Sequence, residues 1–439
     1  MKIEPPIPSI SGGRAPVIHL ARFLLPALLF CSVAAARGAA NKEADYVFKN
    51  GAVYTMDAAA PKAEAVAVTG KEISYVGDNK GAEAHVGKHT QVIDLGGKML
   101  LPGFVESHIH PTLAIVASGA DLPCDSVDKV LARTKAWADA HPDAKLIQGF
   151  GWRYTLFPTT GPTKEVLDKV FPDKPVILVA IDAHSAWLNS KALEMAGIDA
   201  KTPDPAPGVS FFQRDPKTNG PTGWVVETVA EQMVMAKLNP PTPEAVIAAA
   251  ADKFQEFASS GITALFDAGM GTIPTDRGLE GYQRLEKENK LPVRIVASYY
   301  WNSPAITDPV SDVLALRKKF NSELVQVRAL KIMLDGGEAQ HTAVMLQPYA
   351  DRPGFLGEYA IDEKLVKAAV LKAQANGVDT HSHNYGDGAV RTYLDAVEQA
   401  RKAYPNSPSR HASAHNIFVS DQDVPRFAKL DVTMQSSAQ

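Results

Sequence analysis

The stretch Leu101-Pro102-Gly103-Phe104-Val105-Glu106-Ser107-His108-Ile109-His110-Pro111 is the feature that decides the fold of this chain. The mostly apolar residues 99–105 lead into it and Pro111 follows its second histidine, which predicts one buried strand that ends there. Because side chains alternate faces along a strand, His108 and His110 point the same way, roughly 6.6–7 Å apart along the backbone. Two imidazoles on one face can bind one metal ion, although such pairs are more often surface or core polar groups. A metal site here therefore requires further ligands from other strands.

Length and composition predict a globular protein without a nucleic-acid surface. The chain has 439 residues, 45% of them hydrophobic, which suffices for one large domain, or for a large domain and a small one. Its formal net charge of −4 is near neutral, and no internal repeat, low-complexity tract or sustained heptad pattern is present. We therefore expect a small-molecule substrate and no nucleic-acid partner. The oligomeric state stays open.

Residues 1–40 predict a secretory signal peptide. Basic residues precede a short apolar run from Phe23 to Ala36, which ends in small residues and is too short for a membrane span of about 20 apolar residues. Cleavage after Ala36 or Ala40 fits this pattern, and a retained N-terminal anchor is the alternative. The sequence thus predicts a periplasmic or secreted protein with no stable membrane association after cleavage. Cys124 is then the only cysteine, so no internal disulfide can form.

Residues 41–100 predict a small antiparallel β layer ahead of the histidine strand. Short apolar segments at 46–48 and 52–54 flank Lys49-Asn50-Gly51, and Asn-Gly between two such segments is a hairpin signal. A second pair of apolar segments, within 65–76, flanks another turn that contains glycine. We expect this region to form a small domain of its own.

From residue 243 onward, predicted helices alternate with predicted strands, which indicates a parallel sheet. With the histidine strand included, the strands fall at 101–110, 261–267, 293–299, 327–335, 378–383, 412–417 and 431–436. Helices are predicted at 243–260, 278–290, 362–376 and 389–403, with another ahead of the fourth strand. This many units predicts an α/β fold, a (β/α)₈ TIM-type barrel over residues 101–439, in which the eighth strand is missing.

Residues 112–240 predict an insertion between the first two barrel strands. Helical patterns occupy 127–140 and 165–170, and a mostly apolar segment occupies 175–190. The region 199–223 is rich in Pro and Gly and predicts a loop.

Three further residues with metal-binding chemistry fall late in predicted strands, the end at which active sites of such barrels lie: Lys331, His383 and His415. Lys331 interrupts an apolar run, and a buried lysine is costly unless it is paired or modified. A snorkelling or salt-bridged lysine is one interpretation. The other is a carboxylated lysine, because a desolvated amine loses its proton readily, reacts with CO₂, and yields a carbamate that can bridge two metal ions.

His383 or His415 alone would more often be a satisfied core histidine than a ligand. Together with His108 and His110 at matching strand ends, they favour a metal site, and imidazole nitrogens suit Zn²⁺ and its neighbours. Two other histidines rank lower as ligands. His381 lies deeper in its strand and His411 at the entry of its own.

Several segments in the same order resemble one branch of the amidohydrolase superfamily of metal-dependent hydrolases, over about residues 45–439. These segments are Gly103-Phe104-Val105-Glu106-Ser107-His108-Ile109-His110-Pro111, Gly149-Phe150-Gly151-Trp152, Asp182-Ala183-His184-Ser185-Ala186-Trp187-Leu188-Asn189-Ser190, Thr222-Gly223-Trp224-Val225-Val226-Glu227, Lys331-Ile332-Met333-Leu334-Asp335-Gly336, His383-Asn384-Tyr385-Gly386-Asp387 and Arg410-His411-Ala412-Ser413-Ala414-His415. The branch is the amidohydrolase-3 group, similar to N-substituted formamide deformylases and YtcJ-like hydrolases.

The resemblance implies the accessory β-sandwich for residues 41–100 and a metal site with one or two divalent ions, Zn²⁺ favoured. The implied metal-binding residues are His108, His110, Lys331, His383 and His415. His184, from the insertion, would reach the substrate or its oxyanion. A structural role for His184 beside Trp187 has about equal weight.

This sequence departs from the family pattern at its end. The resemblance implies an aspartate at the end of strand eight that takes a proton from the metal-bound water, and no such strand is found. We expect a truncated reading frame or a fragment. The predicted activity is metal-dependent hydrolysis of a non-peptide C–N bond by metal-activated water. The alternatives are a non-catalytic remnant without the aspartate base, and a deaminase or lactonase on the same fold. The substrate, the number of metal ions and the carboxylation of Lys331 stay open.

Overall fold

The computed structural model describes residues 43–303 and 305–436, and the chain divides into two compact units on either side of Pro102. The predicted signal peptide, residues 1–40, lies outside the described residues. Within the described ranges, no helix is long and apolar enough to cross a membrane.

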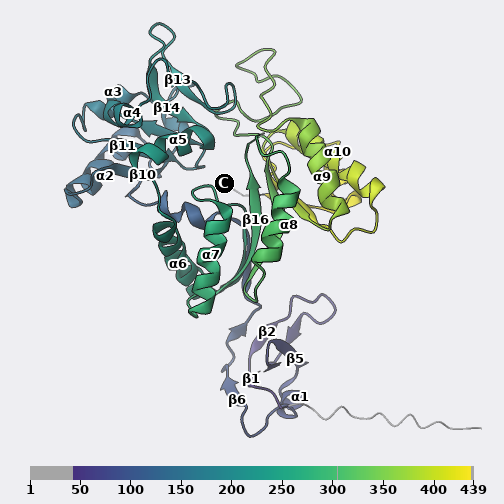
Figure 1. The fold of residues 1–439 in the computed structure, drawn as a ribbon. Helices are drawn as coiled ribbons and strands as arrows, with labels where there is room; N and C mark the ends of the chain where they lie inside the picture. The colour runs from purple at the N-terminus through teal and green to yellow at the C-terminus, as the bar shows by residue number, and fades with distance from the viewer. Residues whose placement is uncertain (1–42, 304, 437–439) are drawn as a thin grey trace, which may run out of the picture. The chain divides into compact units, whose positions relative to one another are not determined.

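The unit that ends at Pro102 contains two small β-sheets (Figure 1). One has the strand order β5 (Glu72–Gly77), β4 (Ala65–Thr69), β1 (Tyr46–Lys49) and β6 (Gln91–Asp94), with helix α1 (Asn79–Glu83) packed against it. The other has the order β3 (Lys62–Ala63), β2 (Ala52–Tyr54) and β7 (Met99–Leu100). A small buried cluster of alanines and Val47 holds the first sheet and α1 together.

The hairpin predicted at Lys49-Asn50-Gly51 is wrong, because β1 and β2 lie in different sheets. Asn50 does adopt a left-handed φ of 57°, but the turn carries the chain from one sheet to the other. Close packing explains the glycine, since a Cβ on Gly51 would lie 2.3 Å from Leu95 Cδ1. The second turn does join an antiparallel pair, β4 and β5. The predicted antiparallel layer is nevertheless wrong in part, because β1 pairs with β6, and β2 with β7, in parallel.

The second unit is built on a seven-stranded parallel sheet, which confirms the predicted α/β barrel-type fold and the absence of an eighth strand in the described residues. The strand order is β20 (Val432–Ser436), β19 (His411–His415), β18 (Asp379–Asn384), β17 (Val325–Met333), β16 (Arg294–Trp301), β15 (Ile262–Asp267) and β8 (Phe104–Ile109). Neighbouring strands are parallel throughout. Because their carboxyl ends share one edge, residues late in these strands lie close together.

The prediction that the histidine strand is buried is wrong, because no residue of β8 is fully buried and its first two residues are exposed. Phe104 is 59% and Val105 69% exposed. In the described residues, β8 pairs with β15 alone, so one of its edges carries no neighbouring strand. The histidines at the other end of the strand are partly covered, because they face the interior of the sheet's carboxyl edge.

A helix precedes each strand from β15 to β20. These helices are α6 (Pro243–Ser259), α7 (Thr275–Lys287), α8 (Pro309–Lys319), α9 (Glu363–Ala375), α10 (Asp387–Ala403) and α11 (Val424–Lys429). In α10, Val390, Tyr393, Leu394 and Val397 recur at helical spacing and are fully buried, so that one apolar face packs onto the core. Figure 1 shows α8 beside β16, and α9 and α10 side by side.

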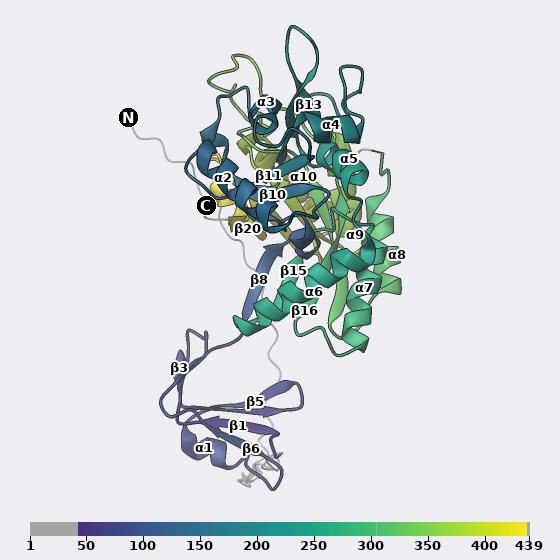
Figure 2. The ribbon, with the colours of Figure 1, turned by 90° about the vertical axis from the view of Figure 1, so that its left-hand side faces the viewer.

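The residues between β8 and β15 form a second, six-stranded sheet, seen with its helices in Figure 2. Its order is β13 (Phe211–Arg214), β14 (Pro221–Val226), β12 (Ser185–Leu188), β11 (Val176–Ala180), β10 (Ile147–Trp152) and β9 (Ala120–Asp121), and its helices are α2 (Val127–Ala140), α3 (Lys164–Asp168), α4 (Ser190–Ala196) and α5 (Thr228–Leu238). The loop predicted at 199–223 is wrong in part, because β13 and the start of β14 fall within it. The Pro and Gly residues that resemble a loop lie before β13, at 203–208, and in the tight turn between the two strands, which the Asp215 carboxylate caps.

Candidate active site

The structure brings all five predicted metal-binding side chains to one cavity at the carboxyl edge of the barrel sheet. His108 and His110 come from the end of β8, Lys331 from β17, His383 from β18 and His415 from β19. The ring centroids of His108 lie 5.3 Å from His110 and 4.7 Å from His415, and those of His383 and His415 are 4.3 Å apart.

His110 is held by a backbone carbonyl. Its Nδ1 lies 2.8 Å from the carbonyl oxygen of Gly269 and donates to it, which leaves Nε2 with its lone pair available. Gly269 has a φ of +126°, and a Cβ at this position would lie 2.9 Å from the Tyr300 side chain. Glycine is therefore required where the chain passes behind the ring of His110.

His108 is held by another histidine. Its Nδ1 lies 2.8 Å from Nε2 of His381, and its own Nε2 is buried without a hydrogen-bond partner. Burial first, and the charge of Lys331 second, lower the pKa of His108 far below its ordinary value, so the ring is neutral. His381, which the sequence ranked below the other histidines, does not line the cavity but orients one that does.

Lys331 is 1% exposed, and its Nζ has no hydrogen-bond partner. Burial lowers the pKa of this amine to about 7. A substantial fraction of the side chain is therefore an uncharged amine at neutral pH, which is the form that reacts with CO₂. Carboxylation of Lys331 remains a prediction.

His383 and His415 complete the cluster. His383 stacks on Tyr385 with ring centroids 5.0 Å apart, and its Nε2 is buried without a partner. Burial lowers the pKa of both histidines well below the ordinary value. His415 has a φ of 73°, a left-handed conformation that is strained for a residue other than glycine and that is often found at functional sites.

The donor set has the chemistry of a divalent metal site. Four imidazoles and one lysine meet, and three of their nitrogens, on His108, His383 and Lys331, are buried without partners. As they stand, however, no three His, Cys, Asp or Glu side chains among residues 43–303 and 305–436 are arranged so that they could hold a metal ion. The candidate ligands thus lie together, but their side chains are not arranged in the geometry of a metal site. The buried nitrogens without partners are the observation that favours a metal.

His184, from the insertion, lies across the cavity from β8, with its ring centroid 5.1 Å from that of His383. Its Nδ1 is 2.6 Å from Oε2 of Glu227. Burial alone would lower the pKa of His184, but the charge and hydrogen bond of Glu227, with smaller effects of Asp182 and Glu231, raise it to about 10. His184 is therefore an imidazolium at neutral pH.

Glu227 is a residue of the site for which the sequence predicts no role. It follows β14 directly, is 3% exposed, and has a φ of 66°. Its Oε1 accepts hydrogen bonds from the backbone N–H of Gly337 and from the Thr342 hydroxyl, so the carboxylate links His184 to the segment after β17. A glutamate directly after an apolar strand is rarely buried unless it is paired, and that signal could have identified it.

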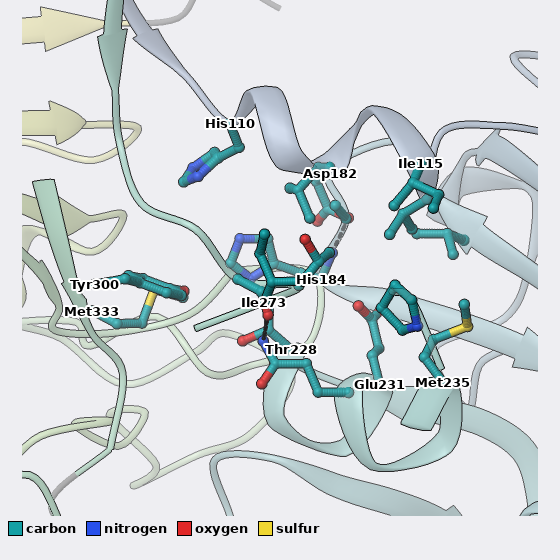
Figure 3. Close-up of a pocket in the computed structure, with 18 of the residues that line it drawn as sticks. His110, Ile115, Asp182, His184, Thr228, Glu231, Met235, Ile273, Tyr300 and Met333 are labelled. Atoms are coloured by element: carbon teal, nitrogen blue, oxygen red, sulfur yellow. Dashed lines mark hydrogen bonds between the residues drawn. The ribbon is translucent and has the colours of Figure 1, made fainter. Parts of the chain in front are cut away.

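The cavity has a volume of about 510 Å³ and two distinct ends. The cluster of histidines with Lys331 forms the polar end. The remaining wall is apolar over most of its area and comes largely from the insertion and from the segment after β15, with Leu113, Ile115, Val116, Ile177, Val179, Ile181, Met235, Ile273 and Pro274. Polar side chains interrupt it, among them Asp182, His184, Thr228, Glu231 and Gln232. Figure 3 shows His110, Asp182, His184 and Glu231 facing this common space. A cavity of this size holds a small organic molecule that places a polar group at one end and an apolar group at the other.

Comparison with known proteins gives the class to which this fold and site belong. The sequence profile of the amidohydrolase family matches residues 91–439, and the chain belongs to this family. It is 32% identical over 397 residues to the exoenzymes regulatory protein AepA of Pectobacterium carotovorum subsp. carotovorum, a match that covers 88% of this chain and 82% of that protein. It is 25% identical over 370 residues to N-substituted formamide deformylase of Arthrobacter pascens, with 82% and 66% covered.

Solved structures of two metal-dependent hydrolases of uncharacterised activity share the fold. The Pyrococcus horikoshii protein gives a TM-score of 0.64 at 22% identity, with 89% of this chain and 74% of that chain covered. The Pyrococcus furiosus protein gives 0.62 at 23% identity, with 89% and 76% covered. The predicted family is thus confirmed, together with its fold.

Proposed function

We propose that this protein is a metal-dependent amidohydrolase that cleaves an amide-type C–N bond outside peptides. One observation carries the proposal: imidazole and amine nitrogens from four barrel strands meet in one cavity whose remaining wall is largely apolar, and three of them lack partners. Membership of the amidohydrolase family supports it, and so does the likeness to N-substituted formamide deformylase.

In this proposal, His108, His110, His383, His415 and Lys331 hold one or two divalent ions, with Zn²⁺ favoured by the imidazole ligands. When bound, the metal supplies Lewis-acid activation of water and of the scissile carbonyl. The Gly269 carbonyl and His381 orient the two histidines of β8, because each fixes the Nδ1 of its ring and leaves Nε2 for the site.

His184 acts on the carbonyl oxygen of the substrate. Glu227 binds its Nδ1 and keeps the ring protonated, which leaves Nε2 as the nitrogen that donates to the oxygen as negative charge develops there. The ring is positioned by the insertion and faces the strand ends, so carbonyl and donor meet inside the cavity. The apolar wall excludes water from the remaining surface of the substrate.

The test uses the full chain, expressed with Zn²⁺, and follows hydrolysis of a panel of N-substituted formamides and other non-peptide amides, with lactones and cyclic amidines beside them. We expect hydrolysis of amides, bound metal by elemental analysis, and loss of both in His383→Ala. His411→Asn is the matched control, because His411 is also a buried barrel histidine but its ring hydrogen-bonds Thr380 and Gln374 and does not line the cavity. Hydrolysis confined to lactones or amidines would refute the proposed bond specificity.

We also propose that the protein acts in the periplasm or outside the cell, on the strength of the secretory pattern in residues 1–40. Cell fractionation of a C-terminally tagged chain, with and without these residues, tests this. Retention of the full chain in the cytoplasm would contradict it.

A further inference from the structure

One acidic side chain in the cavity has no use in the mechanism described above. Glu231 lies on α5, in the part of the wall that the insertion supplies, and its carboxylate faces the cavity beside Met235 (Figure 3). Its Oε1 is buried and has no hydrogen-bond partner. A buried carboxylate oxygen without a partner costs about 1–3 kcal/mol, so a structure that keeps one in a binding cavity has an acceptor available to a ligand.

The other acidic residue that lines the cavity is already occupied. Asp182 accepts hydrogen bonds from Tyr154 and from the His184 backbone at Oδ1, and from Gln340 at Oδ2. Glu231 differs from Asp182, because the acidic side chains near Glu231 add negative charge around it and donate no hydrogen bond to its carboxylate. Of the described acids that line the cavity, only Glu231 therefore has an oxygen left for a ligand.

The charge around Glu231 favours a cation. Three carboxylates, on Asp182, Glu227 and Glu231, interact with the single imidazolium of His184, so this side of the cavity has more negative groups than positive ones. Burial raises the pKa of Glu231 well above its ordinary value, and the charges of Asp182 and Glu227 act in the same direction. A bound ammonium group would reverse these effects, because it gives the carboxylate both a donor and a counter-charge in a poorly solvated place.

We propose that Glu231 binds a protonated amine on the substrate, and that the preferred substrates are amides whose apolar arm carries such an amine. This inference rests on the proposed function, in which the amide carbonyl lies at the histidine cluster. The apolar wall then contacts the arm, and the volume of about 510 Å³ leaves room for an arm much larger than a formyl group. Glu231 is a specificity-determining residue in this arrangement and takes no part in bond cleavage.

The experiment measures binding separately from hydrolysis. Calorimetry on the full chain compares 4-phenylbutylamine, which is protonated at pH 7.5, with 4-phenylbutan-1-ol, a neutral probe of the same length. We expect the wild type to bind the amine about tenfold more tightly, since a charge-assisted hydrogen bond is worth about 1.4 kcal/mol or more. Glu231→Gln should lose this preference, and Met235→Leu, on the same helix and wall, should keep it. Equal binding of both probes by the wild type, or an unchanged preference in Glu231→Gln, overturns the proposal.

A second variant and a kinetic measurement separate a binding role of Glu231 from a structural or a catalytic role. Glu231→Asp keeps the carboxyl group on a shorter side chain and should keep part of the preference, whereas Glu231→Gln should unfold at the same or a higher temperature than the wild type because it replaces a buried ionisable group with a neutral amide of the same shape. With amine-bearing amides, Glu231→Gln should raise KM about tenfold and leave kcat within twofold. A loss in kcat at constant KM would refute the binding role. If no amide is hydrolysed but amine binding still depends on Glu231, the proposed function fails and the assignment of Glu231 stands.

Discussion

The buried ion pair between His184 and Glu227 should make the free energy of unfolding depend on pH, and one isosteric substitution should remove that dependence. Glu227→Gln retains an oxygen that can accept from Gly337 N–H and from the Thr342 hydroxyl. It removes the negative charge 2.6 Å from His184 Nδ1. Without that charge the buried imidazolium has lost its main source of stabilisation, so we expect the pKa of His184 to fall below its ordinary value of 6.5 and the ring to be neutral.

The magnitude follows from the two pKa values of His184. Its pKa is raised from 6.5 to about 10 on folding, so the stabilisation is fully present below pH 6.5 and is lost as pH rises through 10. At pH 7.5 the pKa of folded His184 lies about 2.5 above the pH, and each pKa unit corresponds to about 1.4 kcal/mol. The protonated ring therefore contributes about 3 kcal/mol to the free energy of unfolding. At pH 9.5 the same calculation gives about 1 kcal/mol. The difference in unfolding free energy between wild type and Glu227→Gln should fall accordingly.

Urea denaturation of metal-free protein at pH 7.5, 8.5 and 9.5, followed by tryptophan fluorescence, measures this difference. Asp351→Asn is the control, since Asp351 also binds a histidine, His341 Nε2 at 2.8 Å, but its side chain is 51% exposed. Solvent screening should hold the effect of that control to within about 1 kcal/mol, with little change over the pH series. A destabilisation by Glu227→Gln that stays constant from pH 7.5 to 9.5 would show that His184 is not held as an imidazolium.

Three further predictions concern the barrel. Lys331→Met should raise the metal-free unfolding free energy by about 1–2 kcal/mol, because it removes a buried amine without a partner, and should abolish metal binding in equilibrium dialysis. Gly269→Ala places a Cβ 2.9 Å from Tyr300 at a φ of +126°, so it should lower the free energy of unfolding by about 1–3 kcal/mol and weaken metal binding. An unchanged metal affinity would show that this turn does not position the metal site. His381→Phe should lower metal affinity by about 10–100-fold with little loss of fold, since it leaves the Nδ1 of His108 unbound; unchanged affinity in dialysis would refute its orienting role.

The barrel could be predicted from the sequence because its strands are short apolar runs that alternate with amphipathic helices. The four histidines predicted to bind metal and Lys331 follow from one rule, that the carboxyl ends of parallel strands meet, and all five line one cavity. The exposure of Phe104 and Val105 could not be predicted in this way. An apolar run identifies a strand, but only the pairing of neighbours determines whether its faces are covered.

The contacts that orient the side chains of the site and set their charge could not be predicted from the sequence pattern. His381 has the same parity as His383, but parity gives the face of a strand and not the neighbour that a ring meets across the sheet. Its partner, His108, is 273 positions away along the chain. Glu227 and His184 pair across two antiparallel strands of the insertion, and their register depends on turns whose Pro- and Gly-rich composition resembles a loop.

The strained positions suggest how the family's chemistry and this protein's specificity are divided. Ala183, Glu227 and His415 have φ values of 59°, 66° and 73°, and each such residue costs about 1–3 kcal/mol. Two of them belong to the insertion and lie beside or within the ion pair with His184, and the third ends a barrel strand. Strain of this kind persists only where surrounding packing determines the conformation, so both the insertion and the barrel fix unusual backbone conformations beside the cavity. In the proposed function, the wall that carries Glu231 discriminates among substrates, and the strand ends of the barrel hold the groups that act on the amide bond of each of them.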